Sequence, residues 1–175
     1  MTPRLRLIAF LCAAAVLLLA SGCGSLPVYK GAGITCVGGK WASGVSAGSG
    51  GPSNSTESSL MSEIDSWMGT PYLYGGESRS GVDCSGFTQA VYSSVGVEIP
   101  RTASQQAAAA QEVNPGNLDF GDLLFFNTSG SGISHVGIYI GNGFFAHSSS
   151  SQGVVRESLA KEYYATRIVS AGRVL

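Results

Sequence analysis

The stretch HVGIYIGNGFFAHS, residues 135–148, is the part of the sequence that decides the fold. Apolar residues fill both of its halves, and the Gly-Asn-Gly between them favours a tight turn that joins antiparallel strands. The stretch therefore predicts a β-hairpin made of residues 135–140 and 143–148. Each strand carries one histidine, His135 in the first and His147 in the second. The hairpin places the two imidazoles on neighbouring strands, although the sequence leaves the register open.

Segments on both sides of this hairpin complete the prediction of the fold class. Short apolar or β-branched runs at residues 123–126, 154–156 and 167–175 predict further strands. Before them the hydrophobic period is helical. It predicts helices over residues 57–68, 84–95 and 102–112, the second of them capped by Asp83. Helices first and strands afterwards are typical of an α+β domain, with N-terminal helices packed on a central antiparallel β-sheet. We place this domain at residues 57–175.

The first 22 residues have the pattern of an export signal. Arg4 and Arg6 are followed by an apolar stretch, residues 7–20, and then by the small residues Ala-Ser-Gly. This stretch is shorter than the ~20 residues that a transmembrane helix needs. A positive start, a short apolar core and small residues at its end predict a cleaved signal peptide, residues 1–22.

The residue after this signal is Cys23, and the segment before it resembles the bacterial lipobox. In a lipobox the cysteine is lipidated and becomes the new N-terminus; the alternative is ordinary cleavage with Cys23 unmodified. Because each buried lipid CH2 contributes ~0.8 kcal/mol, several acyl chains would anchor the protein to a membrane. The resemblance implies a location in the cell envelope. In a host with two membranes, Gly24 at the next position implies the outer membrane, facing the periplasm.

The segment after the signal is expected to be a tether. Between Gly24 and Ser55 there are nine Gly and six Ser, a composition that behaves as a flexible chain. Lipidated Cys23 and this tether make up residues 23–56. Loss of the signal lowers the count of basic residues from 10 to 8 against 11 acidic residues, so the net charge becomes −3. No basic cluster is present, which argues against nucleic-acid binding.

Two further cysteines follow Cys23, and one of them occupies a position suited to chemistry. Cys84 lies directly after the predicted cap, where the N–H groups of the helix should lower its pKa. His135 or His147 could then accept its proton. The residues alone leave three interpretations open: a Cys–His catalytic pair, a zinc site made of the cysteine and both histidines, or buried side chains without chemistry. A disulfide with Cys36 is a further alternative in an exported protein.

Two segments resemble the NlpC-type cell-wall endopeptidases, a papain-like family of cysteine peptidases. They are GTPYLYGGESRSGVDCSGFTQAVYSSVGVEIPRTASQQ, which begins at Gly69, and FGDLLFFNTSGSGISHVGIYIGNGFFAHSSSSQGV, which begins at Phe120. The resemblance extends over residues 60–173 and rests on the motifs Gly-Thr-Pro-Tyr, Asp-Cys-Ser-Gly, Pro-Arg-Thr, Gly-Asp-Leu and Ser-His-Val-Gly-Ile-Tyr. It implies a papain-like fold.

The resemblance also implies a role for each candidate residue. Cys84 is the nucleophile, His135 the general base and later the acid, and His147 the polar residue that orients His135. Three further residues are expected at the substrate and the developing oxyanion: Tyr72, Asp83 and Ser85. For Asp83, a role as helix cap alone is an equal alternative. Arg101 matches a family motif but receives no role in the site.

The implied activity is hydrolysis of an amide bond in the stem peptides of peptidoglycan. The expected targets are the crosslink from D-alanine to the diamino acid, which we prefer, and the bond from D-glutamate to the diamino acid. No metal or organic cofactor is expected. Two alternatives remain: a catalytically silent lipoprotein that binds the wall through the same fold, and a transferase that uses the same thiol.

Overall fold

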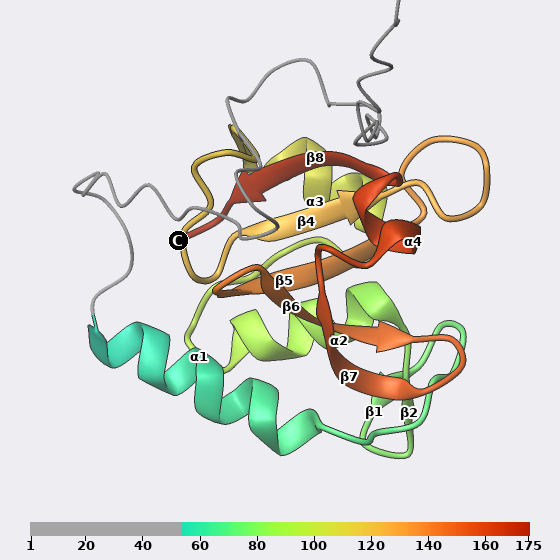
Figure 1. Ribbon diagram of the computed structural model, residues 1–175. Helices are drawn as coiled ribbons and strands as arrows, with labels where there is room; N and C mark the ends of the chain where they lie inside the picture. Colours follow the sequence, from blue (N-terminus) through green and yellow to red (C-terminus); the bar gives the residue numbers. More distant parts are fainter. Residues whose placement is uncertain (1–53) are drawn as a thin grey trace, which may run out of the picture.

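The computed structural model describes residues 54–175, which form a six-stranded antiparallel sheet with helices on both of its faces (Figure 1). The helices are α1 (Asn54–Trp67), α2 (Cys84–Ser93), α3 (Ala103–Ala109) and α4 (Glu162–Ala165). The strands of the sheet, in spatial order, are β3 (Gln111–Val113), β8 (Ile168–Arg173), β4 (Leu123–Phe126), β5 (His135–Gly141), β6 (Phe144–Ser149) and β7 (Gly153–Ser158). A separate small hairpin pairs β1 (Glu77–Ser78) with β2 (Gly81–Val82). The predicted α+β class is confirmed.

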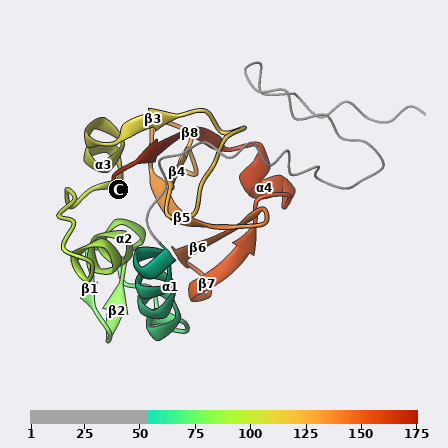
Figure 2. The same ribbon diagram turned by 90° about the vertical axis from the view of Figure 1, so that its left-hand side faces the viewer.

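The central strand β4 is buried on both faces, and it separates two apolar cores. Successive side chains of a strand point to opposite faces of the sheet. Leu123 and Phe125 therefore belong to the core under α1 and α2, whereas Leu124 and Phe126 belong to the core under α4. Figure 2 shows α4 on the side of the sheet opposite to α1 and α2.

The larger core is built by α1 and α2 against β5 and β6. Leu60 and Ile64 lie one turn apart on α1 and are fully buried, as is Phe87 of α2. The ring of Trp67 meets the ring of Phe87 edge to face at 6.3 Å. Each such side chain contributes ~1.5–3 kcal/mol by leaving water. This packing fixes α2, and with it Cys84, against the sheet.

The predicted hairpin is confirmed, and the structure supplies its register. Gly141, Asn142 and Gly143 all have positive φ angles, of 88°, 53° and 77°, as a tight turn between twisted strands requires. Ile138 pairs with Ala146, and the register shifts after the next pair.

Some boundaries differ from the predicted ones. Helix α1 begins at Asn54 instead of residue 57, so the last residues assigned to the tether are helical. The third helix, predicted through residue 112, ends at Ala109 because the chain turns into β3 and pairs with β8. The hairpin of β1 and β2 and the four-residue α4 were not predicted.

Residues 1–53 are not part of this description. The predicted signal peptide, the lipidation site Cys23 and Cys36 therefore lie outside the described residues, as does most of the tether. Within residues 54–175, no helix combines the length and the apolar character needed to cross a membrane. Cys84 is free in this part of the chain.

A buried ion pair joins the start of β4 to the end of β8. The carboxylate of Asp122 is 1% exposed and accepts two hydrogen bonds from the guanidinium of Arg173, both 2.8 Å long. One of its oxygens also accepts the N–H of Asp119 at 2.8 Å. The pair therefore holds the last strand of the chain to the middle of the sheet.

We expect Arg173→Met to lower the free energy of unfolding by roughly 3–5 kcal/mol, because it leaves the Asp122 carboxylate buried and unpaired. Urea denaturation measures this loss. The matched control is Arg156→Met, which removes the half-exposed ion pair with Asp65 and should cost less than about 1 kcal/mol. Equal losses in the two variants would contradict the prediction.

Candidate active site

Asp83 caps α2 and connects it to the preceding loop. Its Oδ1 accepts the N–H of Gly86 at 2.7 Å, and its Oδ2 accepts the N–H of Gly75 at 3.0 Å. The predicted N-cap is confirmed. Because Cys84 is the first residue of α2, this cap also sets the position of the thiol.

Arg101 completes the environment of Asp83, although its match to a family motif did not place it in the predicted site. Its guanidinium donates to both carboxylate oxygens, at 2.9 and 2.7 Å, and to the Oγ of Ser85 at 3.0 Å. Burial tends to raise the pKa of Asp83, but the bonds from Arg101 and Gly86 outweigh it and lower that pKa. Both polar side chains that flank Cys84 are thus engaged within the protein, and contact with substrate remains a prediction for them.

A buried amide holds α3 against the start of α2. The side chain of Gln106 is fully buried; it donates to the carbonyls of Ser85 and Pro100 at 3.0 and 2.8 Å and accepts the hydroxyl of Thr88 at 2.9 Å. Sequence analysis missed this residue. The only signal was its place just after the Pro-Arg-Thr motif, in a helix that otherwise consists of small and polar residues.

The thiol of Cys84 lies between α2 and the start of β5. The residue is 8% exposed, and the backbone N–H of Val136, the residue that follows His135, is near enough to the thiol to lower its pKa. Burial raises the pKa of Cys84, and the N–H groups of Val136, Ser85 and Cys84 itself offset this only in part. The predicted depression of the pKa is therefore wrong, because desolvation outweighs the helix N-terminus.

The two histidines meet directly on neighbouring strands. Nε2 of His135 lies 2.8 Å from Nδ1 of His147, and the two rings are perpendicular. Gly137 makes this contact feasible, since a Cβ there would lie 2.6 Å from the Phe145 ring and 3.1 Å from the Cβ of His147. His135 therefore has only Nδ1 left for a partner other than His147.

The imidazole pair is embedded in aromatic side chains. The His147 ring is 1% exposed and stacks on Phe145 at 4.8 Å, while Tyr164 places its hydroxyl 3.3 Å from His147 Nε2. Burial lowers the pKa of His135 to about 4. Burial, and then the charges of His135 and Lys161, lower the pKa of His147 to about 3. Both imidazoles are neutral near pH 7, as is the thiol of Cys84.

Tyr72 lies beside the thiol. Its backbone bridges to Val82, two residues before Cys84. Burial raises the pKa of the Tyr72 phenol most, and the charge of Cys84 when its thiol is ionised and the charge of Asp83 raise it further. The phenol is therefore close enough to Cys84 to respond to its charge.

The structure thus brings Cys84, His135, His147 and Tyr72 to one end of the sheet, at the start of β5. The contact with His147 leaves Nδ1 of His135 as the ring nitrogen that is a candidate acceptor for the proton of the thiol. The arrangement does not suit the zinc alternative, because the two histidines bind each other instead of converging on one point. Within residues 54–175, no three His, Cys, Asp or Glu side chains form a group that could hold a metal ion.

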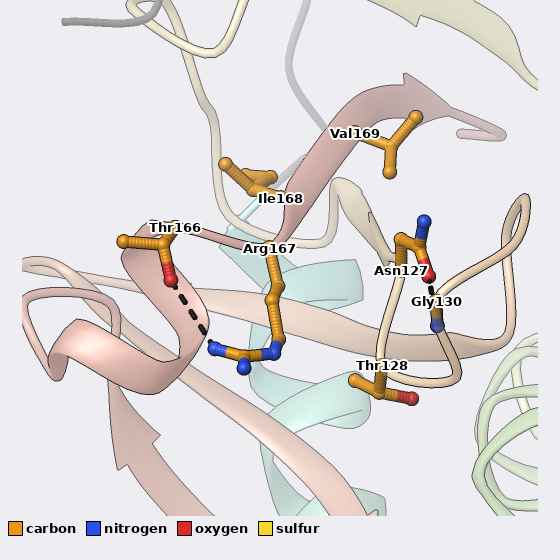
Figure 3. Close-up of a pocket in the computed structure, with 7 residues that line it drawn as sticks. All are labelled: Asn127, Thr128, Gly130, Thr166, Arg167, Ile168 and Val169. Atoms are coloured by element: carbon orange, nitrogen blue, oxygen red, sulfur yellow. Dashed lines mark hydrogen bonds between the residues drawn. The ribbon is translucent and has the colours of Figure 1, made fainter. Parts of the chain in front are cut away.

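A pocket of about 380 Å³ lies between the loop after β4 and the start of β8 (Figure 3). It is lined by Asn127, Thr128, Gly130, Thr166, Arg167, Ile168 and Val169. None of the predicted site residues lines it, and the guanidinium of Arg167 is bonded to the Thr166 hydroxyl at 3.2 Å. We therefore assign it no part in the chemistry.

Comparison with known proteins gives one consistent result. Residues 69–173 match the model of the NlpC/P60 family. The murein DD-endopeptidase MepS/murein LD-carboxypeptidase of Escherichia coli strain K12 is 40% identical over 120 residues, which are 68% of this chain and 63% of that protein. The probable endopeptidase NlpC of the same strain is 43% identical over 117 residues, 66% of this chain and 76% of that protein.

The solved structures that resemble this chain indicate the same family. An NLP/P60 family protein of Staphylococcus aureus, described as similar to a lipoprotein, superposes with a TM-score of 0.66 at 31% identity, over 75% of this chain and 45% of that one. The predicted papain-like α+β fold is thereby confirmed. The chain spans 63% of the length of the first curated relatives that it matches.

The buried histidines predict a loss of stability at mildly acidic pH. Their pKa values in the folded chain lie below the value of ~6.5 in an unfolded chain. Below about pH 6.5 the unfolded chain therefore binds more protons, and the free energy of unfolding falls as the pH falls, by at most ~1.4 kcal/mol per pH unit for each histidine. Urea denaturation at intervals from pH 7 to pH 5 measures this slope.

The variant His147→Asn should show about half of this slope, since one titrating imidazole remains. The window above pH 5 avoids Asp83, whose lowered pKa makes its own contribution fade only below about pH 4. An unchanged slope in the variant would show that His147 is not held neutral by burial.

Proposed function

This chain belongs to the NlpC/P60 family, and we propose that it is a cysteine endopeptidase that hydrolyses an amide bond in the stem peptides of peptidoglycan. The observation that carries the proposal is the 2.8 Å contact from His135 Nε2 to His147 Nδ1, beside Val136, whose backbone N–H lowers the pKa of the Cys84 thiol. We prefer the crosslink from D-alanine to the diamino acid, because the relative with 40% identity is named a DD-endopeptidase. A Bacillus subtilis relative named a DL-endopeptidase is 37% identical, so the bond after D-glutamate is the alternative.

The first step starts from an uncharged Cys84 thiol and an uncharged His135 imidazole. Nδ1 of His135 accepts the proton of the Cys84 thiol while the sulfur attacks the carbonyl carbon of the scissile amide. The imidazolium that forms donates its Nε2–H to Nδ1 of His147, which supports the positive charge. His147 thus both orients the base and stabilises its protonated form.

The negative charge that develops on the carbonyl oxygen needs hydrogen-bond donors. The phenol of Tyr72 keeps its proton because its pKa is raised, so it can donate to this oxygen. The backbone N–H of Cys84 is a second donor. One such donor typically contributes ~2.7–4 kcal/mol to transition-state stabilisation.

The remaining steps return the enzyme to its starting state. The proton on His135 Nδ1 passes to the amine of the diamino acid as the carbon–nitrogen bond breaks, leaving a thioester on Cys84. Water then attacks the thioester and gives one proton back to His135, and the departing sulfur takes that proton. The products are a free carboxylate and a free amine, and no cofactor is consumed.

We also propose that the protein is a lipoprotein of the cell envelope, anchored through Cys23. This proposal rests on the lipobox-like sequence before Cys23 and on the Gly- and Ser-rich segment after it. The tether would let a membrane-bound domain reach the peptide layer of the wall. In a host with two membranes, the anchor would lie in the outer membrane and the domain would face the periplasm.

We expect Cys84→Ser to lower cleavage of purified peptidoglycan by at least about a thousandfold, because serine is not activated by a neutral imidazole to the same extent as a thiol. The released fragments are separated and identified by mass. Ser93→Ala, an exposed change at the other end of α2, is the control and should retain full activity. Undiminished cleavage by Cys84→Ser would refute the proposal.

The same fragments separate the alternatives. A new free amine on the diamino acid indicates hydrolysis, whereas an amide to an added amine indicates transfer. Fragment masses also name the bond. Binding to peptidoglycan without any cleavage by the unaltered protein would favour a silent wall-binding role instead.

For the anchor, we expect Cys23→Ala to move the protein from the membrane fraction to the soluble fraction of the cell envelope. Immunoblots of the two fractions measure the change, and Cys36→Ala is the matched control that should stay with membranes. Equal incorporation of labelled fatty acid into the unaltered protein and the Cys23→Ala variant would rule out lipid anchoring at this position.

A further inference from the structure

Tyr164 is a polar neighbour of the histidine pair to which no role has been given. It lies on α4, is 8% exposed, and directs its hydroxyl at Nε2 of His147 at 3.3 Å. Its ring packs edge to face on His147 at 5.2 Å, on Phe145 at 5.0 Å and on Phe126 at 5.6 Å. The hydroxyl is therefore held in place by the apolar core on this side of the sheet.

Both nitrogens of His147 are engaged, one by His135 and the other by Tyr164. A neutral imidazole carries one N–H, so one of its nitrogens donates and the other accepts. The three side chains can therefore be bonded in only two directions. In one direction His135 donates to His147 and His147 donates to Tyr164. In the other direction Tyr164 donates to His147 and His147 donates to His135.

Only the first direction allows the chemistry. If Tyr164 donates to His147, then His147 donates from Nδ1 to Nε2 of His135, and the proton of His135 must sit on Nδ1. That nitrogen could then not accept the proton of Cys84. If His135 donates from Nε2, its Nδ1 is free, His147 carries its proton on Nε2, and the hydroxyl oxygen of Tyr164 must accept it.

We propose that Tyr164 is a positioning residue whose hydroxyl oxygen accepts the Nε2–H of His147 and thereby holds His135 in the tautomer with a free Nδ1. This inference rests on the proposed function, because it concerns the same base. The residue acts through two imidazoles and does not itself touch the substrate.

The surroundings of Tyr164 support this direction of bonding. Burial, followed by the charges of Glu157 and Tyr163, raises the pKa of Tyr164 to about 12, so its oxygen stays a neutral hydroxyl. Lys161 lies with Nζ 5.8 Å from the centre of the Tyr164 ring and is paired with Glu157. Burial, and then the charges of His135 and Lys161, lower the pKa of His147, which disfavours a second proton on its ring.

The test uses Tyr164→Phe in the full-length protein, since this change removes the oxygen and keeps the ring that fills the core. Tyr163→Phe is the matched control. It removes a hydroxyl from the residue that precedes Tyr164 in the chain, and Tyr163 is 44% exposed. Nitrogen-15 NMR of histidine-labelled protein reports which ring nitrogen of each histidine carries the proton. Steady-state cleavage of a soluble crosslinked muropeptide gives kcat and KM.

In the unaltered protein we expect both His135 and His147 to carry the proton on Nε2. In Tyr164→Phe the buried Nε2–H of His147 loses its acceptor, so the opposite tautomer becomes populated at both histidines. We expect kcat to fall roughly ten- to a hundredfold at constant KM, with a thermal midpoint close to that of Tyr163→Phe. The control should keep the original tautomers and kcat.

Two results would overturn the inference. One is a proton on Nδ1 of His147 in the unaltered protein, and the other is Tyr164→Phe with unchanged tautomers and unchanged kcat. The tautomer measurement needs no substrate, so it remains decisive even if the protein fails to cleave peptidoglycan. Failure of the proposed function and failure of this inference are thus observed in separate experiments.

Discussion

The carboxylate of Asp83 is the interaction on which the rest of the site depends. It accepts hydrogen bonds from the backbone of Gly86 and Gly75 and from the guanidinium of Arg101. These donors belong to α2, to the loop before β1 and to the segment before α3. One side chain therefore connects three pieces of the chain and places the first residue of α2 within reach of the sheet.

The electrostatics of the site follow from burial more than from the helix N-terminus. Desolvation raises the pKa of the Cys84 thiol and lowers the pKa values of His135 and His147. A resting ion pair between the thiol and an imidazole is therefore disfavoured. In the proposed reaction, charge separates as the sulfur attacks the carbonyl carbon, and the inferred role of the Tyr164 hydroxyl is to set the position of one proton before that step.

Features determined by local sequence could be predicted, and features determined by distant contacts could not. Capping preferences predict the N-cap at Asp83, and turn chemistry predicts the turn at Gly141 to Gly143. The hydrophobic pattern predicts the limits of β4. The strand β3 was missed because its Gln- and Ala-rich surroundings favour a helix, and only pairing with β8, far along the chain, overrides that preference.

The same distinction applies to the site. The residues alone left catalysis, zinc binding and simple burial open for Cys84, and the motifs shared with a known family selected the catalytic interpretation. The role of Arg101 could not be read from sequence, because its partner Asp83 is 18 positions away. The raised pKa of Cys84 and the contact from Tyr164 to His147 likewise arise only after the sheet has formed.

The division of the interior by β4 has a consequence for the order in which the region around the histidines is assembled. The thiol belongs to the core on one side of the sheet, while both imidazoles pack into the core on the other side with Tyr164. Helix α4 and β8 are the last elements of the chain. The aromatic surroundings of the imidazole pair are therefore complete only after these later elements have packed on the sheet.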